Sequence, residues 1–231
     1  MARLTIILTL RNIRTDYVSE CLESIRQQTF KDWKVIAVDD FSNIEYDFLE
    51  NYPEVTYVRN AKHLGLCKTL NKAFTLTTTE YVIRLGSDDV FKPDLLEREV
   101  VFLDQHPEFI ACCCCQLQKF GYSTTLIKRP DRWSLEGHDS TQSWHGYGYA
   151  GGLMFRGAAL KHCSINENYP VCEDFDFHLQ LLRLGKIYSI QEPLYLYRAH
   201  GSNLCRRFNP AQRTKILNQI LKCHCLTSYT Q

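Results

Sequence analysis

Strand-like and helix-like segments alternate through the first ninety residues of the chain. The strand-like segments are short runs rich in apolar and β-branched residues, at 4–10, 33–38, 55–58 and 81–85. Between them, residues 16–28 and 66–76 carry apolar side chains at helical spacing. Strands that alternate with helices form a parallel sheet with helices packed on its faces. We therefore predict an α/β fold with a mostly parallel central sheet flanked by helices.

Polar residues follow three of these predicted strands, at the point where each strand ends. They are residues 9–12, Asp39-Asp40 and Asp88-Asp89. The carboxyl ends of parallel strands meet at one edge of a sheet, and α/β proteins bind their ligands at that edge. The sequence therefore predicts a ligand site built from these three clusters.

Asp88 and Asp89 are adjacent carboxylates that repel each other unless a compensating charge is present. A divalent cation with oxygen ligands would compensate them and would also bind a diphosphate. The alternative is an Asx turn or a helix N-cap, which this turn taken alone favours. For Asp39 and Asp40 the choice lies between turn chemistry and a carboxylate that accepts a hydrogen bond from a nucleobase N–H.

Two groups in the second half could also take part in chemistry. Glu173 and Asp174 open a predicted helix at 173–184, where the helix dipole favours acids, but a carboxylate there could also act as a general base. His200 stands alone in the sequence. It is either structural or a third metal ligand, if the chain folds back toward Asp89.

Residues 128–152 are a long segment without periodicity, which in a compact domain is usually functional or mobile. Its aromatic side chains could stack on the sugar rings of an acceptor. They could equally form a hydrophobic cover for the second half of the sheet. The residues concerned are Trp133, Trp144, His145, Tyr147 and Tyr149.

Asn209-Pro210 predicts the start of a final amphipathic helix. We expect this helix to pack against the core rather than to bind a membrane, because Lys215 and Lys222 are few for a membrane surface. Its predicted core residues are Ile216, Leu217, Ile220 and Leu221.

Composition excludes several classes of protein. The 231 residues carry a formal net charge of +1 and contain no block of like charges, so we expect no nucleic-acid partner. The apolar run at 4–10 is too short for a signal peptide, and no window reaches the length of a membrane span. We expect a cytoplasmic protein, with peripheral contact to a membrane left open.

Four of the eleven cysteines are consecutive, at Cys112–Cys115. Neighbouring residues in a strand point to opposite faces, so this run cannot form an ordinary four-ligand metal site. We expect the cysteines to be reduced and mostly buried, as small hydrophobic residues.

Taken in order, these clusters resemble family 2 of the inverting glycosyltransferases, which have a GT-A type fold. The resemblance spans roughly residues 3–203. Residues 38–42 resemble the family's VDDGS element, and residues 28–30 its QTF turn. Further matches are residues 80–93 to the segment that ends in DSDD and a proline, Glu173-Asp174 to the catalytic ED element, and residues 197–202 to the YRxHxxS ending.

The resemblance implies one glycosyltransferase domain over residues 1–231. Its Rossmann-like half, residues 1–91, would bind the nucleotide sugar. A smaller half, residues 92–204, would bind the acceptor and carry the base. Residues 205–231 would form a helical tail.

The resemblance also implies the residues that bind the donor. Thr9 and Arg11 would line the nucleotide pocket, although a tyrosine is common at the position of Arg11. Asp40 would accept the uracil N3–H, and Asp88 would bind the ribose hydroxyls. Basic residues near the nucleotide match Lys68 and Arg84.

For the reaction, the resemblance implies that Asp89 coordinates Mn²⁺ or Mg²⁺ and that His200 approaches the metal or the diphosphate. Gly86 replaces the first acid of the family's DxDD string, which leaves Asp89 as the expected metal ligand. Asp174 would be the general base, and Glu173 is the less favoured candidate.

The function that follows is an inverting, metal-dependent transfer of one sugar from a UDP-sugar to a hydroxyl of a glycan, lipid-linked or protein-linked acceptor. The processive family's QxxRW string is absent, which argues for non-processive transfer. A sugar nucleotidyltransferase is the alternative enzyme, but it needs a glycine-rich loop where this chain has residues 11–15. A non-catalytic nucleotide-sugar or glycan-binding module is the other alternative.

Overall fold

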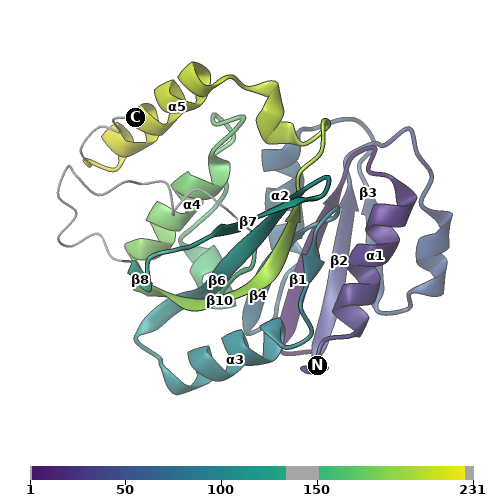
Figure 1. Cartoon of the computed structure of the whole chain (residues 1–231), viewed down its shortest axis with the longest axis horizontal. Coiled ribbons are helices and arrows are strands. Elements are labelled where there is room, and N and C mark those ends of the chain that lie inside the picture. Colours follow the sequence, from purple (N-terminus) through teal and green to yellow (C-terminus); the bar gives the residue numbers. More distant parts are fainter. Residues whose placement is uncertain (1, 134–150, 227–231) are drawn as a thin grey trace.

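The computed structural model describes residues 2–133 and 151–226. Strand β1 (Leu4–Leu10) lies between β2 (Trp33–Asp39) and β4 (Tyr81–Gly86) and pairs in parallel with both. Strand β3 (Val55–Arg59) extends this parallel group beyond β2. The α/β fold predicted from the alternation of segments is therefore confirmed (Figure 1).

The second half of the chain continues the same sheet with mixed directions. Strand β9 (Leu153–Arg156) is antiparallel to both of its neighbours, β4 and β6 (Phe109–Phe120). Strand β10 (Lys186–Arg198) pairs in parallel with β6 and carries register shifts next to Pro193. Three short strands pair with this group: β5 (Val90–Phe91), β7 (Ser123–Ile127) and β8 (Arg132–Trp133).

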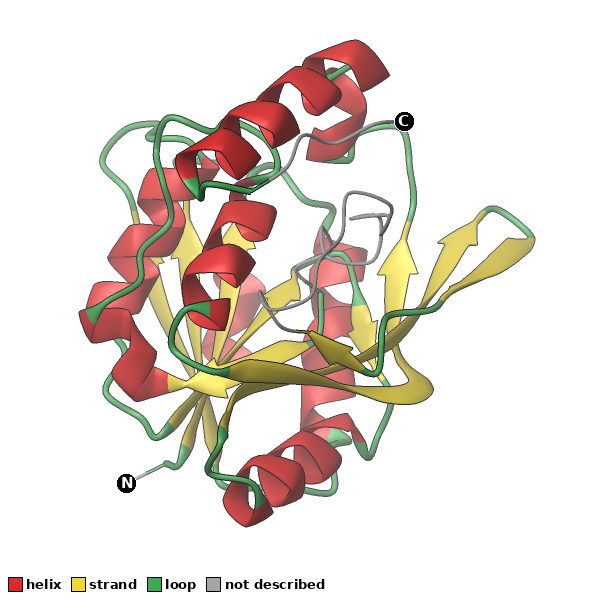
Figure 2. Ribbon diagram, turned by 90° about the vertical axis from the view of Figure 1, so that its left-hand side faces the viewer, coloured by secondary structure: helices red, strands yellow, loops and turns green. Residues whose placement is uncertain are grey.

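Helices cover both faces of the sheet, as the side view shows (Figure 2). Apolar residues of α1 (Thr15–Arg26) and α3 (Leu95–Gln105) pack on one face. Those of α2 (Leu66–Thr75), α4 (Glu173–Leu182) and α5 (Pro210–Cys223) pack on the other. The described residues also form the 3₁₀ turns η1 (Asp47–Asn51), η3 (Gly157–Lys161) and η4 (Leu204–Arg207).

The consecutive cysteines lie in β6 and are all buried. Cys113 belongs to the core on the α4 face, whereas Cys112 and Cys114 belong to the core on the α3 face. This alternation confirms that the run is core packing. Burial raises the pKa of the Cys112 and Cys114 thiols well above the usual value, so both stay protonated at neutral pH.

Burial in the core answers two questions that the sequence left open, the role of Trp133 and the place of the final helix. Trp133 is fully buried, and its ring lies 5.6 Å from that of His178, so it covers the sheet and cannot stack on a sugar. The other aromatic residues of its segment lie outside the described residues. The final helix packs against the core as expected, since Ile220 and Leu221 have no exposed surface.

Candidate active site

The carboxyl ends of β1, β2 and β4 open onto a cleft of about 1110 Å³. Residues of all three polar clusters line it, as the strand-end argument predicted. The predicted site residues on its wall are Thr9, Arg11, Asp40, Lys68, Arg84, Asp88, Asp89, Glu173 and Asp174. His200 does not line the cleft itself but contacts Asp88, which does.

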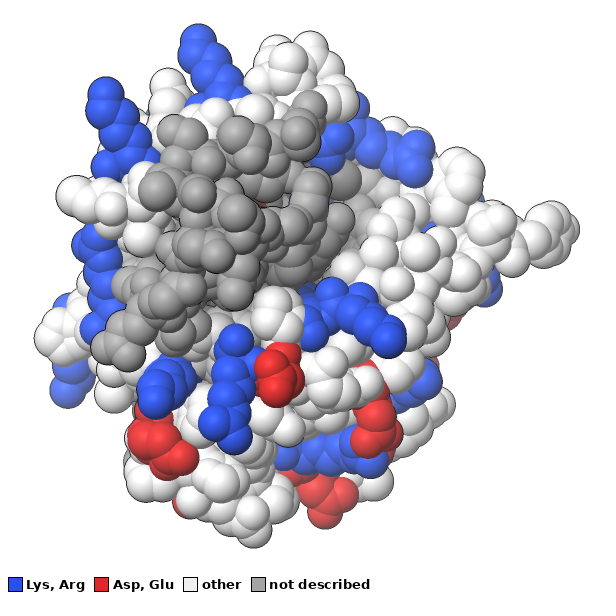
Figure 3. Space-filling view, turned by 60° about the vertical axis from the view of Figure 1, so that its left-hand side comes forward, with Lys and Arg blue, Asp and Glu red and all other residues white. Residues whose placement is uncertain are grey.

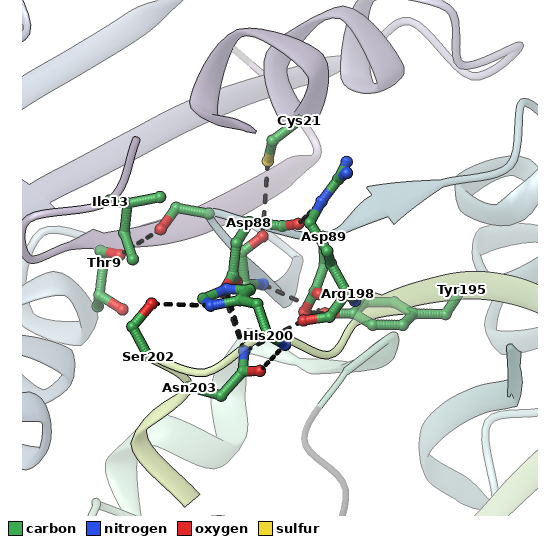
Figure 4. A network of polar contacts seen from close by, with 12 residues as sticks. Thr9, Ile13, Cys21, Asp88, Asp89, Tyr195, Arg198, His200, Ser202 and Asn203 are labelled. Atoms are coloured by element: carbon green, nitrogen blue, oxygen red, sulfur yellow. Dashed lines mark hydrogen bonds and ion pairs between the residues drawn. The ribbon is translucent and has the colours of Figure 1, made fainter. Parts of the chain in front are cut away.

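Asp88 and His200 form a polar pair at the wall of the cleft (Figure 4). The His200 Nε2 atom lies 2.7 Å from Asp88 Oδ2, and both side chains are partly exposed, at 19% and 15%. Ser202 Oγ lies 2.8 Å from Nδ1 of the same ring. Asn203 Nδ2 donates to the same Asp88 oxygen at 3.3 Å. One carboxylate and one imidazole therefore meet at the end of β4, where a diphosphate-binding cation would sit.

Asp89 points away from this pair, toward β10 (Figure 4). Its carboxylate accepts a hydrogen bond from the Tyr195 hydroxyl and another, at 2.8 Å, from the Arg198 backbone N–H. Its exposed fraction is 4%. Burial and, secondly, the neighbouring Asp88 carboxylate raise the pKa of Asp89 to about 8. The expected contact between Asp89 and His200 is not formed; Asp88 makes it instead.

The absence of a side chain at Gly86 is explained by packing, which the sequence did not reveal. A Cβ atom placed on Gly86 would lie 2.3 Å from Asp89 Oδ2. The space that a side chain at position 86 would need is therefore occupied by the Asp89 carboxylate. The Tyr195 hydroxyl also accepts a hydrogen bond from the Gly86 N–H at 3.3 Å, which ties the turn to β10.

Asp40 is buried and holds the loop that follows β3. Its oxygens accept hydrogen bonds from Leu64 N at 2.7 Å, Gly65 N at 2.9 Å and Asn60 Nδ2 at 3.1 Å. The ring of His63, whose side chain is 56% exposed, lies 2.7 Å from Oδ2. Burial alone would raise the pKa of Asp40, but the hydrogen bonds outweigh it and keep the pKa below its usual value. A nucleobase N–H would have to replace one of these partners, because a carboxylate has about four acceptor sites.

Glu173 and Asp174 occupy the first turn of α4 in different environments. Glu173 is buried, and Arg84 Nη1 donates to its Oε1 at 3.0 Å. Asp174 is partly exposed, and its Oδ1 accepts a hydrogen bond from the backbone N–H of Phe175 at 2.8 Å. Burial acts to lower the pKa of Arg84, but the two carboxylates outweigh it and raise the pKa. The charge of Glu173 is therefore already matched inside the protein.

The sequence matches known proteins over most of its length. Residues 5–163 match the family model described as glycosyl transferase family 2. The chain belongs to glycosyltransferase family 2. Over 212 residues it is 24% identical to an uncharacterized glycosyltransferase of Haemophilus influenzae, an alignment that covers 85% of this chain and 65% of that protein. The chain thus spans less than two thirds of that relative's length.

Two solved structures share the GT-A fold of this family 2 chain. TarS of S. aureus, residues 1–349 in complex with UDP-GlcNAc, superposes with a TM-score of 0.80 at 19% identity, covering 99% of this chain and 68% of TarS. The mannosyltransferase PcManGT of Pyrobaculum calidifontis, in complex with GDP-Man and Mn²⁺, gives a TM-score of 0.69 at 17% identity. This superposition covers 99% of this chain and 66% of the PcManGT chain. At these identities the likeness establishes the fold alone.

Sequence reasoning missed one part of this family 2 site. Three arginines from the C-terminal segment, Arg206, Arg207 and Arg213, also line the cleft. The available signal was their charge: residues 193–231 contain Lys and Arg but no Asp or Glu. That signal was missed because the net charge of the whole chain is only +1.

Proposed function

We propose that this protein transfers one sugar from a nucleoside-diphosphate sugar to an acceptor hydroxyl, with inversion at the anomeric carbon. The observation that carries the proposal is that one strand-end cleft is lined both by Asp88, whose carboxylate lies 2.7 Å from His200, and by Asp174. Family membership supports sugar transfer. The nucleotide sugars in the TarS and PcManGT complexes support a nucleoside-diphosphate donor.

The cation in this proposal binds Asp88 and His200 rather than Asp89. Asp88 reaches the cleft beside an imidazole, whereas the oxygens of Asp89 are engaged by Tyr195 and Arg198. One carboxylate and one imidazole suit Mn²⁺, and a cation of this kind takes its remaining ligands from substrate phosphates and water. Among the described residues no preformed cluster of three His, Cys, Asp or Glu side chains suits a metal, in keeping with that sharing of ligands.

Ser202 gives His200 the means to present Nε2 to a metal. A metal-bound imidazole donates its other N–H to a second group, which fixes the tautomer. The Ser202 hydroxyl lies 2.8 Å from Nδ1 and can accept a hydrogen bond from that N–H as well as donate one. When bound, the cation would offset the negative charge that builds on the leaving diphosphate.

Asp174 is the proposed general base. The acceptor hydroxyl attacks the anomeric carbon while Asp174 takes its proton, and the nucleoside diphosphate leaves from the opposite face. Glu173 is the weaker candidate, because its charge is matched by Arg84 at 3.0 Å. In our proposal Glu173 and Arg84 fix the start of α4, and with it the position of Asp174.

The nucleobase is proposed to reach Asp40 by replacing His63. His63 is the partner of Asp40 that costs least to displace, because its side chain is 56% exposed and the other donors belong to the folded loop. A uracil N3–H would then donate to the freed oxygen, which favours a UDP-sugar. Thr9, Arg11 and Lys68 would line the nucleotide, and Asp88 would also approach the ribose.

The acceptor is proposed to be a hydroxyl of a glycan, either free or linked to a lipid or protein. No helix in the described part of the chain is long and apolar enough to cross a membrane. A cytoplasmic location with peripheral membrane contact remains our prediction, as do single-sugar transfer and the division of the domain into residues 1–91, 92–204 and 205–231.

Release of nucleoside diphosphate from a panel of UDP- and GDP-sugars, with Mn²⁺, Mg²⁺ or EDTA, tests the proposal. We expect metal-dependent release from at least one donor. The Asp174→Asn variant should bind that donor normally and lose transfer, while the matched Glu173→Gln variant should retain more activity. Donor binding without turnover would identify a non-catalytic module, and loss of transfer in Glu173→Gln alone would move the base by one residue.

A further inference from the structure

The C-terminal part of the chain has a charge that the proposed reaction does not use. Residues 193–231 contain Arg198, Arg206, Arg207, Arg213, Lys215 and Lys222 and no acidic residue. Figure 3 shows one face of the molecule on which Lys and Arg side chains occur in both the upper and the lower part, whereas acidic side chains lie mainly in the lower part. An anionic group would therefore be attracted to this end of the cleft.

Three of these cations line the cleft itself. Arg206 and Arg207 come from η4, and Arg213 comes from the first turn of α5. Lys215 and Lys222 lie on the exposed side of α5 and do not line the cleft. The three arginines thus face the reaction space, whereas the two lysines face solvent.

These three arginines differ from Arg84 and Lys68, two other cations of the cleft, in having no acidic partner among the described residues. Arg84 pairs with Glu173 at 3.0 Å, and Lys68 lies 3.9 Å from Glu167. Within the described residues no carboxylate lies within 4.0 Å of the guanidinium groups of Arg206, Arg207 or Arg213. The Arg206 guanidinium instead lies over the Phe120 ring, 4.7 Å from its centroid.

The segment that carries these three arginines is attached to the half of the molecule that carries the proposed base. His224 Nε2, just after α5, lies 2.9 Å from Asp176 Oδ1 of α4, and both side chains are buried. The Tyr169 hydroxyl lies 3.4 Å from Cys223 Sγ, also at the end of α5. These contacts hold the C-terminal end of α5 beside α4, and Arg213, in the first turn of α5, lines the same cleft as Asp174.

We infer that Arg206, Arg207 and Arg213 form a subsite for an anionic group of the acceptor, a phosphate or a carboxylate close to the hydroxyl that is glycosylated. Guanidinium groups bind such oxyanions through paired charge-assisted hydrogen bonds. In the proposed function the donor diphosphate would be held by a cation at Asp88 and His200. This inference rests on the proposed function, because it assumes that the cleft holds an acceptor.

Binding of anionic probes tests the subsite. Protein loaded with UDP and Mn²⁺ is titrated with glucose 6-phosphate, glucuronic acid and neutral methyl glucoside, and binding is followed by NMR. We expect at least one anionic probe to bind more tightly than methyl glucoside, and less tightly as salt rises. The phosphate and carboxylate probes distinguish the two sources of charge, and failure of both anionic probes to bind overturns the subsite.

Two matched double variants locate the binding. Arg207→Gln/Arg213→Gln should weaken the anionic probe at least tenfold and change the UDP Kd less than twofold. Lys215→Gln/Lys222→Gln removes the same charge from the outer side of α5 and should change neither. An equal loss in the lysine variant would mean non-specific attraction, and a parallel loss of UDP affinity in the arginine variant would assign the arginines to the donor; either result overturns the proposal.

Two further measurements separate this inference from its alternatives. Metal-dependent release of UDP without acceptor reports the proposed function, and probe binding can be read even where release is absent. Anionic phosphatidylglycerol vesicles test whether the basic segment binds a lipid surface. Vesicle binding lost only in the lysine variant, with no binding of the soluble probes, would replace the subsite by a membrane contact.

Discussion

Glu99 places a carboxyl group in the core without a hydrogen bond. It lies in α3 with no exposed surface, and among the described residues neither of its oxygens has a partner. Burial raises the pKa of Glu99 well above its usual value, and the Arg129 guanidinium offsets only part of that rise. Glu99 is therefore protonated in the folded protein at pH values where an unfolded chain has already released this proton.

This difference makes the free energy of unfolding depend on pH. Below the unfolded pKa of about 4.3 both states hold the proton, so the group contributes no dependence. Above it the folded state binds one proton more, and stability falls by about 1.4 kcal/mol for each pH unit until the folded pKa is reached. Replacing Glu99 by Gln removes the titratable carboxyl group and keeps the shape of the side chain. The Glu99→Gln variant should therefore not lose stability as the pH rises through this range.

Urea unfolding of the wild type and of Glu99→Gln at pH 5, 6 and 7 measures the effect. The stability of the variant relative to the wild type should increase with pH over this series, with a slope of at most about 1.4 kcal/mol per unit. Glu97→Gln, in the first turn of the same helix and exposed, is the matched control and should follow the wild type. Parallel pH profiles for the wild type and Glu99→Gln would refute the reasoning.

Two other variants test the donor site and the C-terminal helix. Asp40→Asn should weaken UDP binding about tenfold, a loss of about 1.4 kcal/mol by calorimetry, while His63→Ala should leave it unchanged or tighter; weaker binding in His63→Ala would mean that His63 itself holds the nucleotide. Asn209→Ala removes a capping box in which Asn209 accepts from Gln212 N, and should lower the free energy of unfolding by about 1 kcal/mol, whereas Gln219→Ala, exposed on the same helix, should not.

Local patterns in the sequence were sufficient to predict the first half of the fold. The strand at 4–10 and the helix at 66–76 were found within a residue or so, because their apolar spacing records which side faces the core. For the last strand, the apolar pattern of the sequence predicts residues 194–197 alone, whereas β10 begins at Lys186. Pro193 and the register shifts around it interrupt the alternation on which the prediction relied.

The site illustrates the same limit. The sequence placed Asp88 and Asp89 at a strand end and, because Gly86 stands at the position of an acid, led us to expect the cation on Asp89, whereas our proposal places it on Asp88. Which carboxylate pairs with His200 depends on Tyr195 and Arg198, which bind Asp89 from another strand and are 106 and 109 residues away from it. Contacts over that separation leave no local pattern. The sequence interpretation paired His200 with Asp89, whereas in the structure His200 contacts the neighbouring residue, Asp88.

Mn²⁺ binding in the presence of UDP tests the central claim most directly. Electron paramagnetic resonance of free Mn²⁺ gives its Kd for the wild type and for two matched variants, Asp88→Asn and Asp89→Asn. We predict that UDP-dependent Mn²⁺ binding weakens at least tenfold in Asp88→Asn. It should weaken much less in Asp89→Asn, since the amide oxygen introduced there can still accept a hydrogen bond from Tyr195 or Arg198. Wild-type affinity in Asp88→Asn, or a wild type that binds no Mn²⁺ with UDP, would contradict the account.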